Sequence, residues 1–416
     1  MAETVKNKDM KLRLTLTGLG GLALAGLAVW CAAAEKAPSD HLLLDEVKTI
    51  MADNFFDQSR LPAFLAGLEA IEKNPNDVRP EINRLLDELQ VSHIGLYTPD
   101  DLGYYEYLDV FRFVHADKLK KLFPPDGVVR YPGIGIIPRL MDGRYYVAFV
   151  LAGTPAAGAG ILPGDELMSV DGLEYSPVKA FKGRAGRTVK LALRRERNGP
   201  ELEREVAVEN LNPGETFITS TAASARIIEH GGRKFGYLRL YAFTDDKIRQ
   251  ILDDKLCGPD FAPAEALILD LRGRLGGAPL DAAEIFVGGT PSVEIIASRV
   301  GGAMQINCRW TRPLVAIIGP ETRSGMEILA YSLKRAGRPL VGANTQGALL
   351  GGAIFILKDG SLMMIPGVDF KLDGQRLEGI GIAPTVPVEA TLEYGQGRDP
   401  QLEAAVKKAA EIAGGG

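Results

Sequence analysis

The sequence is poor in the residues that build metal and redox sites. Its 416 residues include only 4 His and 3 Cys, and these form neither an H-E-x-x-H nor a C-x-x-C motif, which disfavours a zinc site of the usual kinds. No P-loop and no complete dinucleotide-binding glycine motif is present. We therefore expect no cofactor and no metal. If catalysis requires an imidazole, the candidates are His41, His93, His115 and His230.

Concentrated positive charge is also lacking. Lys and Arg number 48 against 53 Asp and Glu, which leaves a formal net charge of −5. Nucleic-acid binding depends on clustered Lys and Arg that neutralise phosphates, so nucleic acid is not expected as a partner. The hydrophobic fraction of 46% is ordinary for a globular protein. A chain of this length is sufficient for about three domains of ~150 residues.

Residues 1–34 have the pattern of a targeting segment. Basic residues between Lys6 and Arg13 precede an uncharged stretch from Leu14 to Ala34 that is rich in Leu, Ala and Gly. This order, closed by small residues, is typical of a secretory signal peptide. The same stretch is long enough to span a bilayer as an uncleaved helix. We predict export to the periplasm or cell envelope, with the segment either cleaved or retained as an inner-membrane anchor.

The rest of the chain divides by its apolar spacing into four parts. They are a helical domain (residues 40–125), a β-rich domain (130–210), an α/β core (211–400) and a C-terminal helix and tail (401–416). In the α/β core, residues 266–271 and 314–319 form near-continuous apolar runs, which predict parallel strands buried on both faces.

Cys257 and Cys308 are the cysteines that follow the targeting segment. Two cysteines in an exported protein could form a disulfide. Their spacing along the chain does not establish that they approach within bonding distance. We predict two free, buried thiols.

Residues 152–172 resemble the central motif of bacterial PDZ domains, SPAxxAGLxxGDxIxxIDG. Gly133, Ile134, Gly135 and Ile136 stand where such domains place their carboxylate-binding loop. The resemblance implies that the backbone N–H groups of this loop bind the C-terminus of a polypeptide, which also pairs with a sheet edge. The alternative is a spacer or lid that binds no peptide.

Three runs in the α/β core together resemble the carboxy-terminal processing, or tail-specific, serine peptidases. Residues 267–277 are similar to the family's DLRxNxGG run, residues 324–328 to SASEI, and residues 377–384 to GIxPD. The resemblance implies a mixed α/β peptidase core of crotonase-like ββα units behind the helical and PDZ-like parts. It also implies that Ser324 is the nucleophile.

The chain departs from this family at the general base. Ala348 stands where the family's GxxTxGK run has its catalytic Lys, and Gly352 aligns with a Gln that usually follows it. We interpret Lys334, on the helix after Ser324, and Lys358, in a hairpin turn, as surface lysines. A Ser–Lys mechanism therefore cannot be carried over to this sequence.

An imidazole is the base that suits a serine nucleophile near neutral pH. The tricorn-like and chlamydial secreted-protease-like branch of the superfamily takes its His from a turn after the N-terminal helices, where this chain has His93. Glu378 matches the acid that orients the His in those relatives. The resemblance thus implies a triad of Ser324, His93 and Glu378.

The residues around Ser324 also suggest an oxyanion hole and a helix cap. Gly325, together with Gly276 or Gly277, is expected to supply N–H donors to the oxyanion. Ser324 could instead serve as a helix N-cap, because Glu327 follows three residues later as in a capping box. The two roles of Ser324 are compatible.

Two functions follow as hypotheses. The first is an exported serine endopeptidase that acts on polypeptides, through their C-termini, by an acyl-enzyme on Ser324. The second is a catalytically inactive relative that binds peptides as an adaptor. It is suggested by Ala348, which stands in place of the family's catalytic Lys. Carriage of small hydrophobic ligands, as in the retinoid-carrier branch, is a third. We predict no particular oligomeric state.

Overall fold

The computed structural model describes residues 40–73, 78–289, 293–296, 303–306 and 308–414. The predicted targeting segment, residues 1–34, lies outside the described residues. Within the described part, no helix combines the length and the apolar character needed to cross a membrane.

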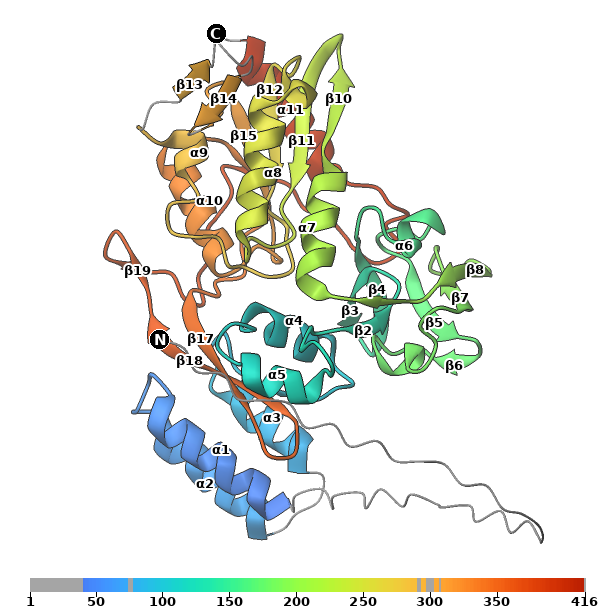
Figure 1. Cartoon of the computed structure of the whole chain (residues 1–416), viewed down its shortest axis with the longest axis vertical. Coiled ribbons are helices and arrows are strands. Elements are labelled where there is room, and N and C mark those ends of the chain that lie inside the picture. The colour runs from blue at the N-terminus through green and yellow to red at the C-terminus, as the bar shows by residue number, and fades with distance from the viewer. Residues whose placement is uncertain (1–39, 74–77, 290–292, 297–302, 307, 415–416) are drawn as a thin grey trace, which may run out of the picture. The chain divides into compact units, whose positions relative to one another are not determined.

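Three helices open the described chain, as the apolar spacing predicted. They are α1 (Asp40–Asn54), α2 (Leu61–Lys73) and α3 (Val78–Glu88). A hairpin from much later in the chain covers them, with strands β17 (Leu350–Ile356) and β18 (Leu362–Asp369) and with β1 (Gly95–Tyr97) paired to β18. Met363 and Ile365 of this hairpin pack in one core with Val47 and Ile82 of the helices (Figure 1).

Two shorter helices complete the helical part. They are α4 (Leu102–Val110) and α5 (Ala116–Leu122). Their core is rich in tyrosine, and it also contains Phe149 of the β-rich part and Leu275 and Ile354 of the α/β part. The helical residues therefore share a core with the parts that follow them.

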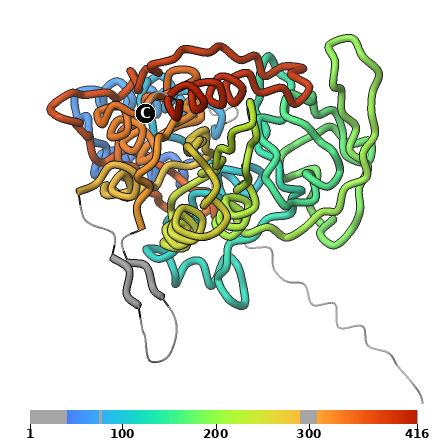
Figure 2. The backbone as a smooth tube through the Cα atoms, turned by 90° about the horizontal axis from the view of Figure 1, so that it is seen from above, coloured from blue at the N-terminus to red at the C-terminus, as the bar shows by residue number. Residues whose placement is uncertain are grey.

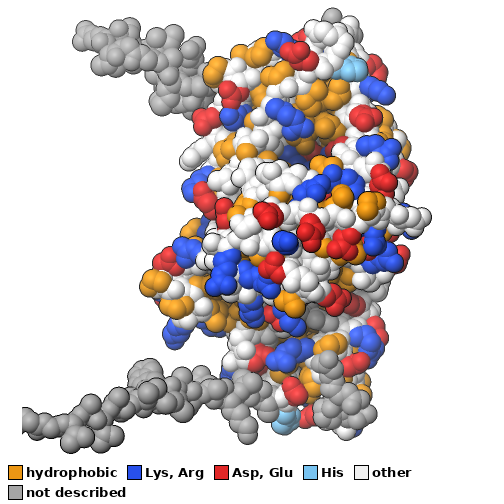
Figure 3. Space-filling view, turned by 90° about the vertical axis from the view of Figure 1, so that its right-hand side faces the viewer, with side chains coloured by type: hydrophobic (Ala, Val, Ile, Leu, Met, Phe, Trp, Pro, Cys, Tyr) orange, Lys and Arg blue, Asp and Glu red, His pale blue; other side chains and the backbone are white. Residues whose placement is uncertain are grey.

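The β-rich part contains an antiparallel sheet. Its strands are β3 (Ile136–Met141), β4 (Arg144–Val150), β5 (Glu166–Val170), β7 (Thr188–Arg194) and β8 (Glu201–Ala207), in that order, with β6 (Leu173–Glu174) paired to β5. The short helix α6 (Pro155–Gly158) packs against it, and β2 (Tyr131–Gly133) pairs with β9 (Glu209–Leu211) nearby. Strand β3 lies at one edge of the sheet. On the face seen in Figure 3, Lys and Arg side chains are interspersed with Asp and Glu.

The α/β part is built on a second sheet. Its strands run in the order β10 (Arg226–His230), β11 (Arg233–Arg239), β12 (Ala266–Asp270), β15 (Leu314–Ile318), β16 (Leu340–Gly342) and β21 (Val386–Pro387). Only β10 and β11 pair antiparallel; the other neighbours are parallel.

Helices cover both faces of this sheet, which confirms the predicted α/β class. Leu267 and Leu269 of β12 point into a core with α7 (Pro213–Ser224), α8 (Asp246–Cys257), α9 (Glu284–Val287) and α10 (Gly325–Arg335). Ile268, between them, faces the opposite core with α11 (Pro400–Gly414). In Figure 2, α11 (dark red) and α8 (yellow) lie on opposite sides of this sheet. Burial on both faces explains the continuous apolar runs of β12 and β15.

Cys257 and Cys308 form a disulfide, so the prediction of two free thiols is wrong. Cys257 ends α8, and Cys308 follows the hairpin of β13 (Val293–Ile296) and β14 (Ala303–Ile306). The fold brings their Cα atoms to 6.0 Å although they are 51 positions apart in sequence. That separation is in the normal range for a bonded pair.

Candidate active site

Ser324 lies at the turn between β15 and α10 in a backbone conformation that residues with a Cβ rarely adopt. Its φ is 54° and its ψ is −132°. The Ser324 N–H is held by the carbonyl oxygen of Ala348 at 2.9 Å and by the Glu327 carboxylate at 3.1 Å. Strained backbone of this kind persists only where surrounding contacts enforce it, and it concentrates at functional sites. The turn leaves Ser324 partly exposed at the N-terminus of α10.

Glu327 organises the loop around Ser324. Its buried carboxylate accepts the N–H groups of Gly347 at 2.8 Å and Ala348 at 2.7 Å, and the Thr345 hydroxyl at 2.5 Å. Burial raises the pKa of Glu327, and these hydrogen bonds act in the opposite direction. The predicted capping box of Ser324 and Glu327 is thus present, with the Glu327 carboxylate accepting the Ser324 N–H.

Glu378 and His93 meet through a residue that sequence reasoning missed. The Ser92 hydroxyl donates to one Glu378 oxygen at 3.1 Å and lies 2.8 Å from Nδ1 of His93. The Ser92 N–H donates to the other Glu378 oxygen at 2.8 Å, and the Leu349 N–H donates to the same carboxylate at 2.7 Å. The acid therefore acts on the imidazole through a serine hydroxyl rather than directly. Only the position of Ser92 beside His93 could have pointed to it.

His93 is held in a strained position with a neutral ring. Its φ is 55°, and a Cβ on Gly352 would lie 3.2 Å from the His93 Cβ and Cδ2 atoms, so the imidazole packs directly over that glycine. Burial, with the nearby charge of Arg323 as a second cause, lowers the pKa of His93 to about 3. A neutral imidazole is the form that can accept a proton.

Ser324 and His93 are connected through their neighbours rather than by a direct bond. In this structure no hydrogen bond joins the two described side chains. The Ala348 carbonyl holds the Ser324 N–H, and the next residue, Leu349, donates to the carboxylate that holds Ser92. Because Nδ1 of His93 faces Ser92, the nitrogen that remains for proton transfer is Nε2.

Gly276 is the glycine of the predicted pair that approaches Ser324. A Cβ on Gly276 would lie 2.4 Å from the Ser324 Cβ and 3.0 Å from the Gly325 nitrogen. Gly277 packs instead against Thr244, to which its Cβ would come within 2.4 Å. Gly325 is the first residue of α10, so its N–H has no acceptor within the helix. Gly325 and Gly276 are therefore the oxyanion candidates that the geometry favours over Gly277.

The two lysines near Ser324 in sequence lie at the surface, as predicted. Lys334 is exposed and donates to the Ala383 carbonyl at 2.8 Å. Lys358 is exposed and lies 4.0 Å from Glu46. Ala348 is fully buried beside Ser324, so the position of the family's Lys carries no ionisable group here.

The predicted peptide loop joins β2 to β3. The side chains of Ile134 and Ile136 are buried in the core of the antiparallel sheet. The Gly135 carbonyl accepts the Leu151 N–H at 2.9 Å, which ties the loop to the chain after β4. The outer edge of β3 has no partner strand among the described residues, which is the arrangement that strand addition by a peptide requires.

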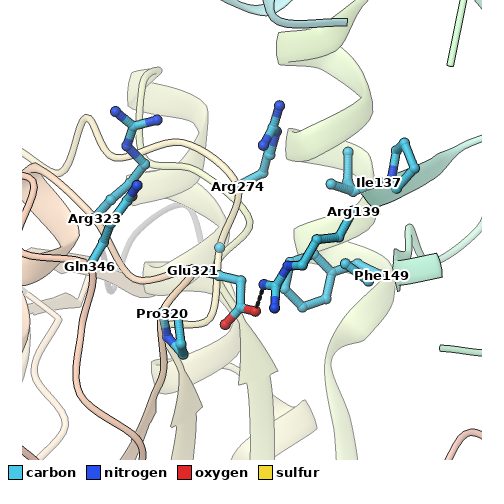
Figure 4. A pocket seen from close by; sticks show the side chains of 11 residues that line it. Ile137, Arg139, Phe149, Arg274, Pro320, Glu321, Arg323 and Gln346 are labelled. Carbon is cyan, nitrogen blue, oxygen red and sulfur yellow. Dashed lines mark hydrogen bonds and ion pairs between the residues drawn. The ribbon is translucent and has the colours of Figure 1, made fainter. Parts of the chain in front are cut away.

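A pocket of about 350 Å³ lies between this edge and the Ser324 turn (Figure 4). Its walls come from β3 and β4 on one side and from the loops after β12, β15 and β16 on the other. The labelled side chains are Ile137, Arg139, Phe149, Arg274, Pro320, Glu321, Arg323 and Gln346. The pocket thus connects the edge strand with the residue that precedes Ser324.

Residues 234–388 match the model of peptidase family S41. This stretch runs from β11 to β21 and contains Ser324 and Glu378, whereas Ser92 and His93 lie before it. The sheet strands from β11 to β21 and the strained turn at Ser324 thus lie in the part that matches, and β10 lies before it.

Curated relatives cover more of the chain. It is 28% identical over 282 residues to carboxyl-terminal-processing peptidase 3, chloroplastic, of Arabidopsis thaliana, a match that covers 63% of this chain and 54% of the relative. It is 27% identical over 274 residues to a carboxyl-terminal-processing protease of Synechocystis sp., and 62% of each chain is covered. The matched region spans about half to three fifths of the length of these relatives.

A solved structure shares the fold. The photosystem II D1 C-terminal processing protease superposes with a TM-score of 0.51 and 19% sequence identity, covering 88% of this chain and 99% of that chain. At this identity the likeness concerns the fold alone. It extends over the helical, β-rich and α/β parts together.

Proposed function

We propose that this protein is a serine endopeptidase of the carboxyl-terminal processing type. The observation that carries the proposal is the strained Ser324 turn at the start of α10, held beside the His93–Ser92–Glu378 chain of hydrogen bonds. The S41 match and the relatives named as processing proteases support the same class of hydrolase.

His93 acts as the base in the proposed reaction. The Ser324 oxygen attacks the peptide carbonyl carbon while Nε2 of His93 accepts the hydroxyl proton. Burial keeps the imidazole neutral before this step. Ser92, held by Glu378, accepts the Nδ1–H and stabilises the imidazolium that forms. A missing Ser324–His93 hydrogen bond is compatible with this role, because such pairs are often long before substrate binds.

The backbone at Gly276 and Gly325 stabilises the tetrahedral intermediate. Gly276 packs against the Ser324 Cβ and Gly325 follows Ser324 in the chain, so their N–H groups are the donors that we assign to the oxyanion. His93 then returns its proton to the leaving amine, which breaks the peptide bond and leaves an ester on Ser324. Water attacks this ester with His93 again as base, which releases the new carboxylate and restores the serine.

The edge of β3 presents the polypeptide to this centre. A peptide paired with that edge would extend along the pocket toward Arg323, the residue before Ser324. The loop Gly133–Ile136 at the start of β3 then binds the polypeptide's C-terminus. We further propose that residues 1–34 direct the chain to the periplasm or cell envelope, as a cleaved signal or as an anchor.

A serine-directed probe tests the proposal. The wild-type protein should be labelled by a fluorophosphonate and should cleave β-casein, whereas Ser324→Ala and His93→Ala should each lose at least about 100-fold in rate. Lys334→Ala is the matched control and should keep full activity, because its side chain is exposed and donates to the Ala383 carbonyl, away from Ser324 and His93. Cleavage that survives both active-site changes would overturn the assignment. Peptide binding without labelling or cleavage would instead favour the inactive adaptor.

A further inference from the structure

The pocket beside Ser324 is lined by more positive than negative charge. Its ionisable residues are three arginines, Arg139, Arg274 and Arg323, and one carboxylate, Glu321. Arg139 is paired with Glu321 across the pocket, as the dashed line in Figure 4 shows. Figure 4 also shows the guanidinium groups of Arg274 and Arg323 pointing away from that pair.

Arg274 is neutralised by a second carboxylate. Its Nε lies 3.1 Å from both oxygens of Glu106, which is almost completely buried on α4. This contact is the largest cause of a raised pKa at Arg274. Two of the three arginines are therefore already paired.

Of the three pocket arginines, Arg323 is the one for which no carboxylate of the described residues is a partner. Its Nη1 donates to the Tyr107 hydroxyl at 3.1 Å, and its buried Nε has no hydrogen-bond partner. A planar guanidinium in this state is suited to a carboxylate, which can accept two parallel N–H bonds. One such group would complete the charge balance of the pocket.

The position of Arg323 ties this unpaired charge to the reaction centre. It directly precedes Ser324, and its charge is close enough to act on His93. A polypeptide bound for attack by Ser324 therefore passes the guanidinium within a few residues of the bond to be cleaved. Gln346, exposed on the same wall, offers a further hydrogen-bonding amide.

We infer that this pocket binds a carboxylate of the polypeptide close to the scissile bond, with Arg323 as the residue that selects it. The carboxylate belongs to an Asp or Glu side chain or, in a polypeptide whose end does not occupy the Gly133–Ile136 loop, to the C-terminus itself. This inference rests on the proposed function for the identity of the ligand as a polypeptide. It gives the site a preference for acidic over basic substrates.

Equilibrium binding tests the inference without depending on turnover. In the Ser324→Ala background, three fluorescein-labelled alanine-rich decapeptides are compared by anisotropy. One has a central Glu and an amidated end, the second has Gln and an amidated end, and the third has Gln and a free C-terminal carboxylate. A charge-assisted contact predicts about tenfold tighter binding of at least one carboxylate peptide than of the neutral peptide. The peptide that gains identifies the source of the carboxylate.

Variants of Arg323 decide whether the pocket is responsible. Arg323→Gln should bring all three peptides to within about twofold of one another, and Arg323→Lys should retain part of the preference because it keeps the charge. Arg84→Gln, on an exposed ion-paired arginine of α3, is the matched control and should change nothing. Equal binding of the three peptides, or a preference that survives Arg323→Gln, overturns the inference. Labelling of the wild type by the fluorophosphonate is measured separately. Its absence would count against the proposed function and not against the carboxylate site.

Discussion

The hydroxyl of Ser92 lies between the Nδ1 atom of His93 and the carboxylate of Glu378, 2.8 Å from the first and 3.1 Å from the second. Because the hydroxyl donates to the carboxylate, it can accept the Nδ1–H and so favours the tautomer with a free Nε2. The imidazole thus receives its orientation from a hydroxyl, and the carboxylate acts one bond further away.

Removal of that hydroxyl should slow catalysis without abolishing binding. Ser92→Ala leaves His93 without a partner at Nδ1, so we expect kcat for β-casein to fall about tenfold or more, with little change in KM. Ser92→Thr keeps a hydroxyl and should recover part of the rate. Ser59→Ala, which removes an exposed hydroxyl bonded to Asp57, is the control. An unchanged kcat in Ser92→Ala would show that the bridge has no part in the reaction.

The acid side of the pH profile should lie below the ordinary range for histidine. Since the pKa of His93 is lowered to about 3, the base stays neutral as the pH falls through 6.5, and kcat/KM should persist there. Arg323→Gln removes one of the two causes and should move the acidic limb to higher pH. The measurement uses a C-terminally amidated substrate without Asp or Glu, so that the carboxylate preference does not enter. An acidic limb near pH 6.5 in both proteins would contradict the expectation.

A methyl group at Gly276 should disturb the nucleophile directly. Its Cβ would lie 2.4 Å from the Ser324 Cβ, so Ser324 or the glycine loop must shift. A displacement of this size can cost about 100-fold in rate. Gly276→Ala should therefore lose activity and fluorophosphonate labelling while its melting temperature stays near that of the wild type. Gly158→Ala, on α6, meets nothing within 4 Å and should behave as the wild type.

The disulfide should contribute to stability. It cross-links α8 to the segment after β14 across 51 positions, and a loop of that size predicts about 2–4 kcal/mol of stabilisation. The double variant Cys257→Ser/Cys308→Ser should lower the free energy of unfolding by that amount in urea titrations. The intact mass of the wild type should rise by about 2 Da on reduction, since two hydrogens are added. No mass change, or equal stability of the two proteins, would speak against the bond.

Local patterns predicted the elements that carry Ser324. The apolar runs of β12 and β15 can be read from the sequence because both faces of those strands are buried. The turn into α10 could also be predicted, because the apolar run ends at residue 319 and Ser324 with Glu327 has the pattern of a helix start. The assignment of His93 as the base came only from the family resemblance. A single histidine after a helix forms no periodic pattern that would single it out.

Contacts between distant segments account for what the sequence did not reveal. The bridge from Ser92 to Glu378 joins positions 286 residues apart. The approach of Cys257 to Cys308 depends on how α8 and the β13–β14 hairpin pack. The choice of Gly276 over Gly277 depends on which of two adjacent residues faces the Ser324 turn. None of these relations leaves a trace in spacing or composition.

The position of Glu378 in the sequence determines when, during synthesis of the chain, the hydrogen bonds around His93 can form. The Glu378 carboxylate joins the segment that follows the first helices to the loop after β16, and it lies itself near the end of the α/β part. A growing polypeptide that already carries Ser92 and His93 cannot orient the imidazole until residue 378 has been synthesised and folded back. Under the proposed function, synthesis of residue 378 therefore sets the earliest moment at which cleavage can begin, and fragments that end before Glu378 should show no cleavage of β-casein.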